Sequence, residues 1–203
     1  MNLKRMGLIS AIAATVFGLL YIIALLLTLL DLIPKPWDTF WQLLPSIFLA
    51  WSFISLMACL YKSISANRSI YAFVGVLVSI IYATINSIVY STVLAVVIPG
   101  LLAGKQSELA LLLFEPGKFL FSINGLAYML MSISALLASF SFNGKGNESK
   151  VKWTMLSHGI IGPFIMGAVL WPPLTYIGAL WIVTFPAFGI ASIIYFTQLT
   201  ADH

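Results

Sequence analysis

The charged side chains of this 203-residue chain, ten basic and six acidic, all lie between six long apolar stretches or at the edges of these stretches. A helix needs about 20 mostly apolar residues to cross the hydrocarbon core of a bilayer. Each stretch is long enough for one crossing, and the stretches cover residues 7–30, 40–61, 70–99, 118–142, 153–171 and 175–198. The pattern predicts an integral membrane protein with six transmembrane helices.

The composition agrees with this prediction. Hydrophobic residues make up 61% of the chain and charged residues only 8%, whereas about a quarter of the residues in soluble domains are charged. The connections between the stretches are too short to fold into a separate domain. We therefore expect an all-α polytopic helical bundle that forms a single transmembrane domain over residues 1–203.

The basic residues predict how the bundle is oriented. Lysine and arginine are enriched in the cytoplasmic loops of membrane proteins. With a cytoplasmic N-terminus, seven basic residues lie on the inner side, namely Lys4, Arg5, Lys62, Arg68, Lys145, Lys150 and Lys152, and three lie outside, namely Lys35, Lys105 and Lys118. We expect both termini to be cytoplasmic in a multi-pass protein of a cell membrane, with a prokaryotic inner or plasma membrane favoured. The net charge of +4 then reflects topology, and no nucleic-acid partner is expected.

A stripe of small residues follows the first predicted span. Its members recur at spacings of four, three and four residues, and they are Gly7, Ala11, Ala14 and Gly18. Small side chains let two membrane helices approach closely. The stripe predicts either packing within the bundle or docking of a partner membrane subunit or a second copy of the chain.

The longest outer connection contains the sequence SELALLLFEPG. Ser107 and Glu108 form a helix-start pattern, and Pro116-Gly117 forms a stop. The segment is too short to cross the membrane. We expect a short interfacial helix over residues 107–115, which rests on the bilayer surface or covers the outer mouth of the bundle.

The six predicted spans divide into three plus three at the outer connection between the third and fourth spans, over residues 100–117. An odd number of spans in each half gives the halves opposite orientations, as in inverted-repeat transporters. Three prolines, Pro45, Pro163 and Pro186, lie within predicted spans and are expected to bend them. Such bends shape the bundle, and they also line substrate paths in some transporters.

Polar side chains form two stripes inside the membrane. At helical spacing, one face of the third span carries Ser79, Tyr82, Asn86 and Tyr90, and the fourth span carries Asn124 and Tyr128. One interpretation is that these groups bond between helices and stabilise the bundle. The other is a binding pocket for a neutral or lipid-like small molecule, because pockets combine apolar walls with few polar groups.

Chemistry that needs ionisable groups has few candidates in this chain. His158 is the only ionisable residue within a span apart from tyrosines and Cys59. We expect it to snorkel or to form a hydrogen bond near the interface, and a proton-responsive role is the alternative. A bis-histidine haem needs a second histidine, and a zinc site needs three or four ligands, so no cofactor and no metal are expected. Acid–base or nucleophilic catalysis needs paired groups, so a non-enzymatic protein is expected.

The second half carries several recognisable runs. They are LLFEPGKFLFSINGLAYMLMSISALLASFSF, KWTMLSHGIIGPF and IGALWIVTFPAFGIASIIYF, with a Phe-Leu-x-Ser start, a Gly-x-x-Tyr pair and a Leu-Trp-x-Val-Thr-Phe-Pro run. In these features the chain resembles a group of small, uncharacterised, six-helix integral membrane proteins of bacteria and archaea. The resemblance covers most of the chain and implies the six-span fold, but no activity.

Two functional hypotheses follow. The leading one is a membrane protein that binds or transports a neutral or lipid-like small molecule in the interior of the helix bundle. The alternative is a non-catalytic structural or accessory subunit of a larger membrane complex. A channel is disfavoured, because no ring of charges and no carbonyl-filter sequence marks a permeation path.

Overall fold

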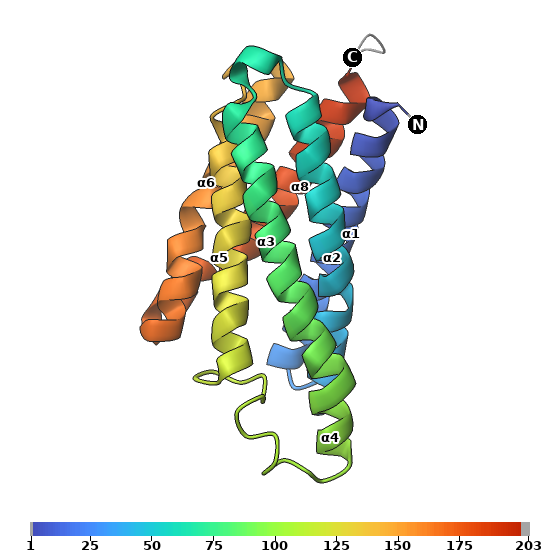
Figure 1. The fold of residues 1–203 in the computed structure, drawn as a ribbon, viewed down its shortest axis with the longest axis vertical. Coiled ribbons are helices and arrows are strands. Elements are labelled where there is room, and N and C mark those ends of the chain that lie inside the picture. The colour runs from blue at the N-terminus through green and yellow to red at the C-terminus, as the bar shows by residue number, and fades with distance from the viewer. Residues whose placement is uncertain (1, 200–203) are drawn as a thin grey trace.

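The computed structural model describes residues 2–199, and all regular secondary structure in this part of the chain is helical. Six of its helices are long and apolar enough to cross a membrane, as predicted. The spans alternate in direction, so that Leu3 and Gln198 lie at the same end of the bundle (Figure 1). We call this the termini end, which is the predicted cytoplasmic side, and we call the opposite one the distal end.

The spans are built from α1 (Leu3–Leu29), α2 (Trp37–Lys62), α3 (Ile70–Thr92), α5 (Phe119–Ser139), α6 (Gly146–Leu170) and α8 (Trp181–Gln198). A short 3-10 helix, η1 (Ala66–Arg68), connects α2 to α3 at the termini end. The last span begins with a 3-10 turn, η3 (Pro172–Leu174), and with the short α7 (Thr175–Gly178), which precede α8.

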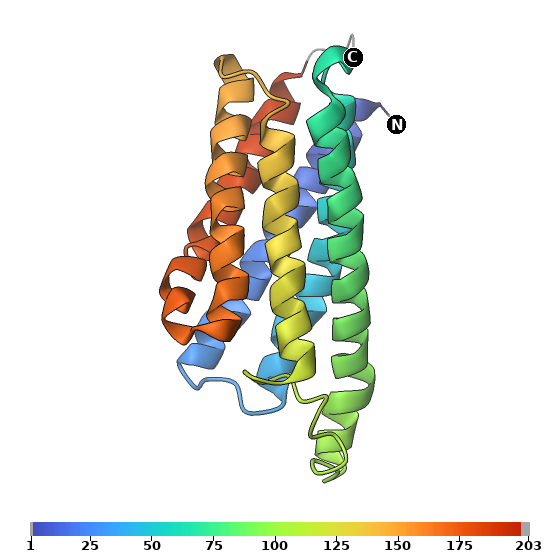
Figure 2. The same cartoon turned by 60° about the vertical axis from the view of Figure 1, so that its left-hand side comes forward.

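The third span continues beyond α3 through a π-helical segment, η2 (Val93–Val97), into α4 (Ile98–Leu102). Pro99 explains this change of geometry, because proline has no N–H to donate and its ring collides with the preceding helical turn. A π-helical insertion relieves this collision without ending the helix. α4 consequently extends beyond the other helices at the distal end (Figures 1 and 2).

The expected interfacial helix over residues 107–115 does not form. This segment follows a series of turns, in which Leu109 N donates to Gln106 O and Leu112 N donates to Leu109 O. Leu109 and Leu113 are buried, and Leu109 packs over Gly100 at the end of the third span. Tertiary packing of these leucines on the bundle thus outweighs the local helix signals.

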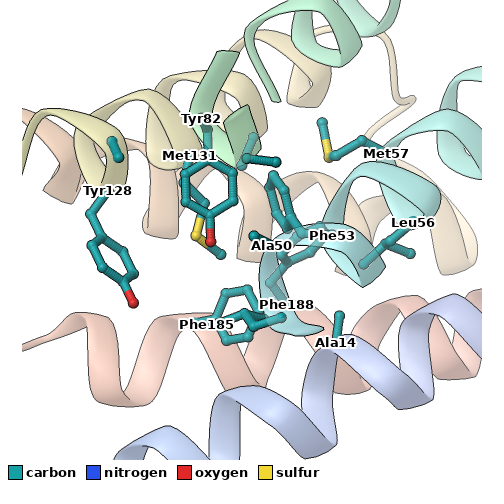
Figure 3. Packing of buried hydrophobic residues seen from close by; sticks show 14 of the residues in the cluster. Ala14, Ala50, Phe53, Leu56, Met57, Tyr82, Tyr128, Met131, Phe185 and Phe188 are labelled. Atoms are coloured by element: carbon teal, nitrogen blue, oxygen red, sulfur yellow. The ribbon is translucent and has the colours of Figure 1, made fainter. Parts of the chain in front are cut away.

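The small-residue stripe lies inside the bundle. Gly7, Ala11, Ala14 and Gly18 are all buried. Gly7 lies directly against the ring of Phe196, and Gly18 lies against the ring of Phe185, so α1 and α8 approach closely. Figure 3 shows Ala14 beside Phe185 and Phe188 of α8. The stripe is used for packing within the chain.

Candidate ligand cavity at the distal end

A cavity of about 740 Å³ lies at the distal end of the bundle. Its walls come from α1, α2, the loop between α4 and α5, α5, α6, η3, α7 and α8. Small-molecule sites in proteins typically have volumes of roughly 300–1,000 Å³ and predominantly apolar walls. The cavity therefore has the size of a ligand site.

The cavity forms where the last span diverges from the first. From the termini end to the cavity floor α1 follows α8, with Gly7 against Phe196 and Gly18 against Phe185. At the floor the Tyr21 ring lies edge-on to the Trp181 ring, with centroids 5.5 Å apart. Before Trp181, the chain follows α6 instead, since Gly178 of α7 lies against Ile165.

Three aromatic rings form the floor of the cavity, which we define as Tyr21, Tyr128 and Trp181. The Tyr128 and Trp181 rings meet edge-on, with centroids 5.7 Å apart. All three line the cavity, whereas the next buried residues toward the termini end do not. Phe185 stacks under Trp181, with ring centroids 5.2 Å apart. The floor separates the cavity from the closely packed part of the bundle.

The structure divides the six predicted ligand-binding residues. Asn124 and Tyr128 line the cavity. Tyr90 does not, but its hydroxyl donates a hydrogen bond to the Tyr128 hydroxyl over 3.1 Å. Tyr90 therefore acts on the cavity wall through Tyr128 rather than by direct contact with the cavity.

The other three predicted residues, Ser79, Tyr82 and Asn86, are fully buried in α3 away from the cavity wall. The Ser79 hydroxyl donates to Val76 O within its own helix. Figure 3 shows Tyr82 beside Tyr128, and their ring centroids are 6.2 Å apart. Helical periodicity correctly placed these side chains on one face of the third span. Neighbouring helices cover this part of the face, so these three side chains do not reach the cavity.

Two residues of the cavity wall hold polar atoms without a hydrogen-bond partner. They are Oδ1 of Asn124 and Nε1 of Trp181, and both atoms are buried. A buried polar atom without a partner costs about 1–3 kcal/mol. Both atoms lie beneath the surface of the cavity, so a ligand would bond to them only after the Asn124 and Trp181 side chains rotate.

Sequence reasoning missed Gln42 and Thr175, which also line the cavity. Gln42 Nε2 donates to Thr28 Oγ1 over 2.9 Å, and this bond fixes the amide at the edge of the site. A polar amide within an apolar span is itself a functional signal, so Gln42 was open to prediction. Trp181 belongs to the Leu-Trp-x-Val-Thr-Phe-Pro run, but nothing in the sequence indicated that its indole forms part of a cavity floor.

The described residues that line this cavity include no Asp, Glu, Lys, Arg or His. Among residues 2–199 there is also no group of three or more His, Cys, Asp or Glu side chains that could hold a metal ion. The polar groups of the site are amides, hydroxyls and an indole. They suit hydrogen bonding to an uncharged ligand.

His158 is fully buried, so the expectation that it snorkels to the interface was wrong. Its helix begins at Gly146 rather than at residue 153, which places His158 about three turns inside the helix. Nδ1 lies 3.3 Å from Thr184 Oγ1, so the predicted hydrogen bond exists, but Nε2 has no partner. His158 lies beside Phe185 and Phe188 and does not line the cavity.

A second, shallower space of about 440 Å³ lies along α1 and α2. Its lining residues are hydrophobic and include Phe17 and Phe48, whose rings stack with centroids 5.2 Å apart. Apart from the indole of Trp41, no side chain in this wall carries a polar group. The groove can accept an acyl chain of the bilayer but cannot orient a polar ligand.

Comparison of the chain with protein-family models, with curated proteins and with solved structures finds no match. The resemblance to small six-helix membrane proteins thus stays a prediction.

Proposed function

We propose that this protein binds a neutral, amphiphilic small molecule in the cavity at the distal end of its helix bundle. The single observation that carries the proposal is a cavity of about 740 Å³ whose apolar wall holds a few uncharged polar groups. Two of these groups, on Asn124 and Trp181, contain buried atoms without hydrogen-bond partners. Such a combination of apolar surface and sparse polar groups is typical of ligand sites.

The chemistry of the wall selects the class of ligand. A charged ligand would leave water without gaining an opposite charge, which is costly in a membrane interior. An uncharged ligand with a hydroxyl, carbonyl or amide can bond to Asn124, Tyr128 and Gln42. Its apolar part can lie against the aromatic floor and the aliphatic residues of α6. We propose binding without catalysis, because the wall offers no acid–base pair.

The test is native mass spectrometry of the protein released from a mild detergent. We expect a bound small molecule on the wild-type protein and about tenfold lower occupancy on Asn124→Leu, which corresponds to roughly 1.4 kcal/mol of lost hydrogen bonding. Asn86→Leu is the matched control, because Asn86 lies on α3 away from the cavity wall. A wild-type protein without a bound molecule, or equal occupancy on Asn124→Leu, would contradict the proposal.

The accessory-subunit hypothesis rested on docking of a partner through Gly7, Ala11, Ala14 and Gly18. That face lies against α8 of the same chain and is buried. No other observation on the described residues favours a partner subunit over a ligand. The same mass measurement addresses this hypothesis, since a partner or a second copy adds the mass of a whole chain.

A further inference from the structure

Among residues 2–199, most of the side-chain hydrogen bonds that join the two halves of the chain lie at the termini end. The first half comprises α1 to α4 and the second comprises α5 to α8. At the termini end, Arg68 Nη1 of the first half lies 3.1 Å from Glu148 Oε2 of the second. The Tyr195 hydroxyl donates to Ser63 Oγ over 3.0 Å, and this bond also joins the halves. We call these two contacts the termini clamp.

The loops around the clamp reinforce it. Arg68 Nη1 also lies 3.4 Å from Ser141 O, and Ser141 Oγ accepts a hydrogen bond from Ala72 N. Ala72 lies in the first turn of α3, where backbone N–H groups have no partner within the helix. The second half thus caps a helix of the first half. These bonds are few, and the Arg68 and Glu148 side chains are partly exposed, so the contact can break and re-form.

At the distal end, a cavity rather than a set of polar contacts lies between the two halves. There the cavity lies between Leu25 and Gln42 of the first half and α5 to α8 of the second. The Tyr90–Tyr128 bond, which lies between the two ends, is the one side-chain hydrogen bond between the halves that the described residues form outside the termini end. The molecule is therefore closed at the termini end, by these polar contacts and by the packing of Gly7 on Phe196, and it is hollow at the distal end.

Unpartnered polar atoms lie at the level of the cavity floor and beyond it toward the termini end. They are the Tyr82 hydroxyl, both polar atoms of the Asn86 amide, Ser132 Oγ and His158 Nε2, on three different helices. All four residues are fully buried. Ser132 lies one turn from Tyr128, and His158 lies against Phe185, directly under Trp181. These groups would gain partners if a polar path opened between the floor and the termini clamp.

We infer that this protein carries its ligand across the membrane by alternating access, with the termini clamp as the closed gate of a state open at the distal end. The inference rests on the proposed function. Rocking of one three-span half against the other around the Tyr90–Tyr128 contact would break the clamp and close the cavity. Halves with odd numbers of spans and a site between them suit this motion.

Accessibility to a charged methanethiosulfonate reagent, which does not cross a bilayer, tests the gate without knowledge of the ligand. In a Cys59→Ala background, Ser132→Cys reports on the interior beyond the floor. In vesicles with the termini end exposed to the reagent, we expect slow modification. Arg68→Ala and Glu148→Gln should each raise the rate about tenfold, because they shift the population toward the state open at that end.

Two control positions calibrate the rates. Asn67→Cys, in the exposed η1, should react rapidly in every background. Ile81→Cys, whose side chain faces the lipid side of α3, should stay unmodified. Glu148→Gln retains an oxygen that can accept the Asn143 N–H, so its loop should remain folded even if Arg68→Ala disturbs it.

The opposite side of the membrane gives the decisive comparison. Ala168→Cys, on the cavity wall, should react with reagent applied at the distal end, and this rate should fall in the same gate variants. An unchanged Ser132→Cys rate in both variants would overturn the inference. A rise at Ser132→Cys without a fall at Ala168→Cys would also overturn it, since it indicates a loosened bundle. If either result is obtained and mass spectrometry still detects a ligand on the wild-type protein, the proposed binding function is supported and the transport inference is rejected.

Discussion

The hydroxyl of Tyr90 in α3 donates to the hydroxyl of Tyr128 in α5 over 3.1 Å, and this bond joins the two halves of the chain beside the cavity. Tyr90 is fully buried, so its hydroxyl cannot exchange this partner for bulk water. The bond therefore contributes to stability.

Tyr90→Phe should lower the free energy of unfolding by about 0.6–1.5 kcal/mol, the range for hydrogen bonds between membrane helices and within buried networks. Thermal or denaturant unfolding in detergent measures the change. Tyr71→Phe, on the exposed start of α3, is the matched control and should have no effect. In a double-mutant cycle, Tyr90→Phe and Tyr128→Phe should be coupled. Additive effects would show that the two hydroxyls do not interact.

Close packing of α6 on α5 depends on Gly159. A Cβ at this position would lie 2.7 Å from Leu136 Cα, which is backbone and cannot rotate away. Gly159→Ala should destabilise the protein by about 1–3 kcal/mol, because the two helices must separate. Gly144→Ala is the control, since a Cβ there meets no atom within 4 Å. Equal unfolding free energies for the two variants would refute this account of the interface.

The spans were predictable from sequence because their physical cause is local. An apolar run of sufficient length is a membrane helix wherever its neighbours lie. Proline effects are equally local, and Pro99 accounts for the change in helix geometry in the third span. The start of α6 was less predictable. Its first turns are polar in sequence, yet Val151 and Met155 are buried against the bundle, which extends the helix back to Gly146.

The site was predictable only in part, because a cavity depends on which helices meet. Periodicity placed Asn124 and Tyr128 on a polar face, and both line the cavity. The same periodicity could not show that Asn86 would be covered by neighbouring helices. Pro172 and Pro173 follow Trp171, and proline cannot continue a helix, so the end of α6 has a local cause. However, the sequence could not show that α7 packs against α6 rather than against α1, because this depends on tertiary packing.

For Asn86, the structure and the interpretation that the polar stripe bonds between helices give opposite predictions. Both polar atoms of its amide are buried without partners. Removing such a group relieves an unsatisfied desolvation penalty, so Asn86→Leu should raise the free energy of unfolding by about 1 kcal/mol. If the amide instead formed a hydrogen bond to a neighbouring helix, Asn86→Leu would lower the free energy of unfolding by about 0.6 kcal/mol. Ser79→Ala, whose hydroxyl bonds only within its own helix, is the neutral comparison.

Filling the cavity should remove the ligand without unfolding the protein. Ala168 lies on the wall contributed by α6, and Ala168→Phe adds a ring to the space next to Val169 and Ile165. We expect ligand occupancy in native mass spectrometry to fall at least about tenfold, since even 1.4 kcal/mol of lost binding energy has this effect. Ile23→Phe adds comparable aromatic bulk to the separate apolar groove of α1 and α2, and it should leave occupancy unchanged. A fall in Ile23→Phe but not in Ala168→Phe would move the site to that groove, and the ligand would then be a lipid chain held by apolar contact alone.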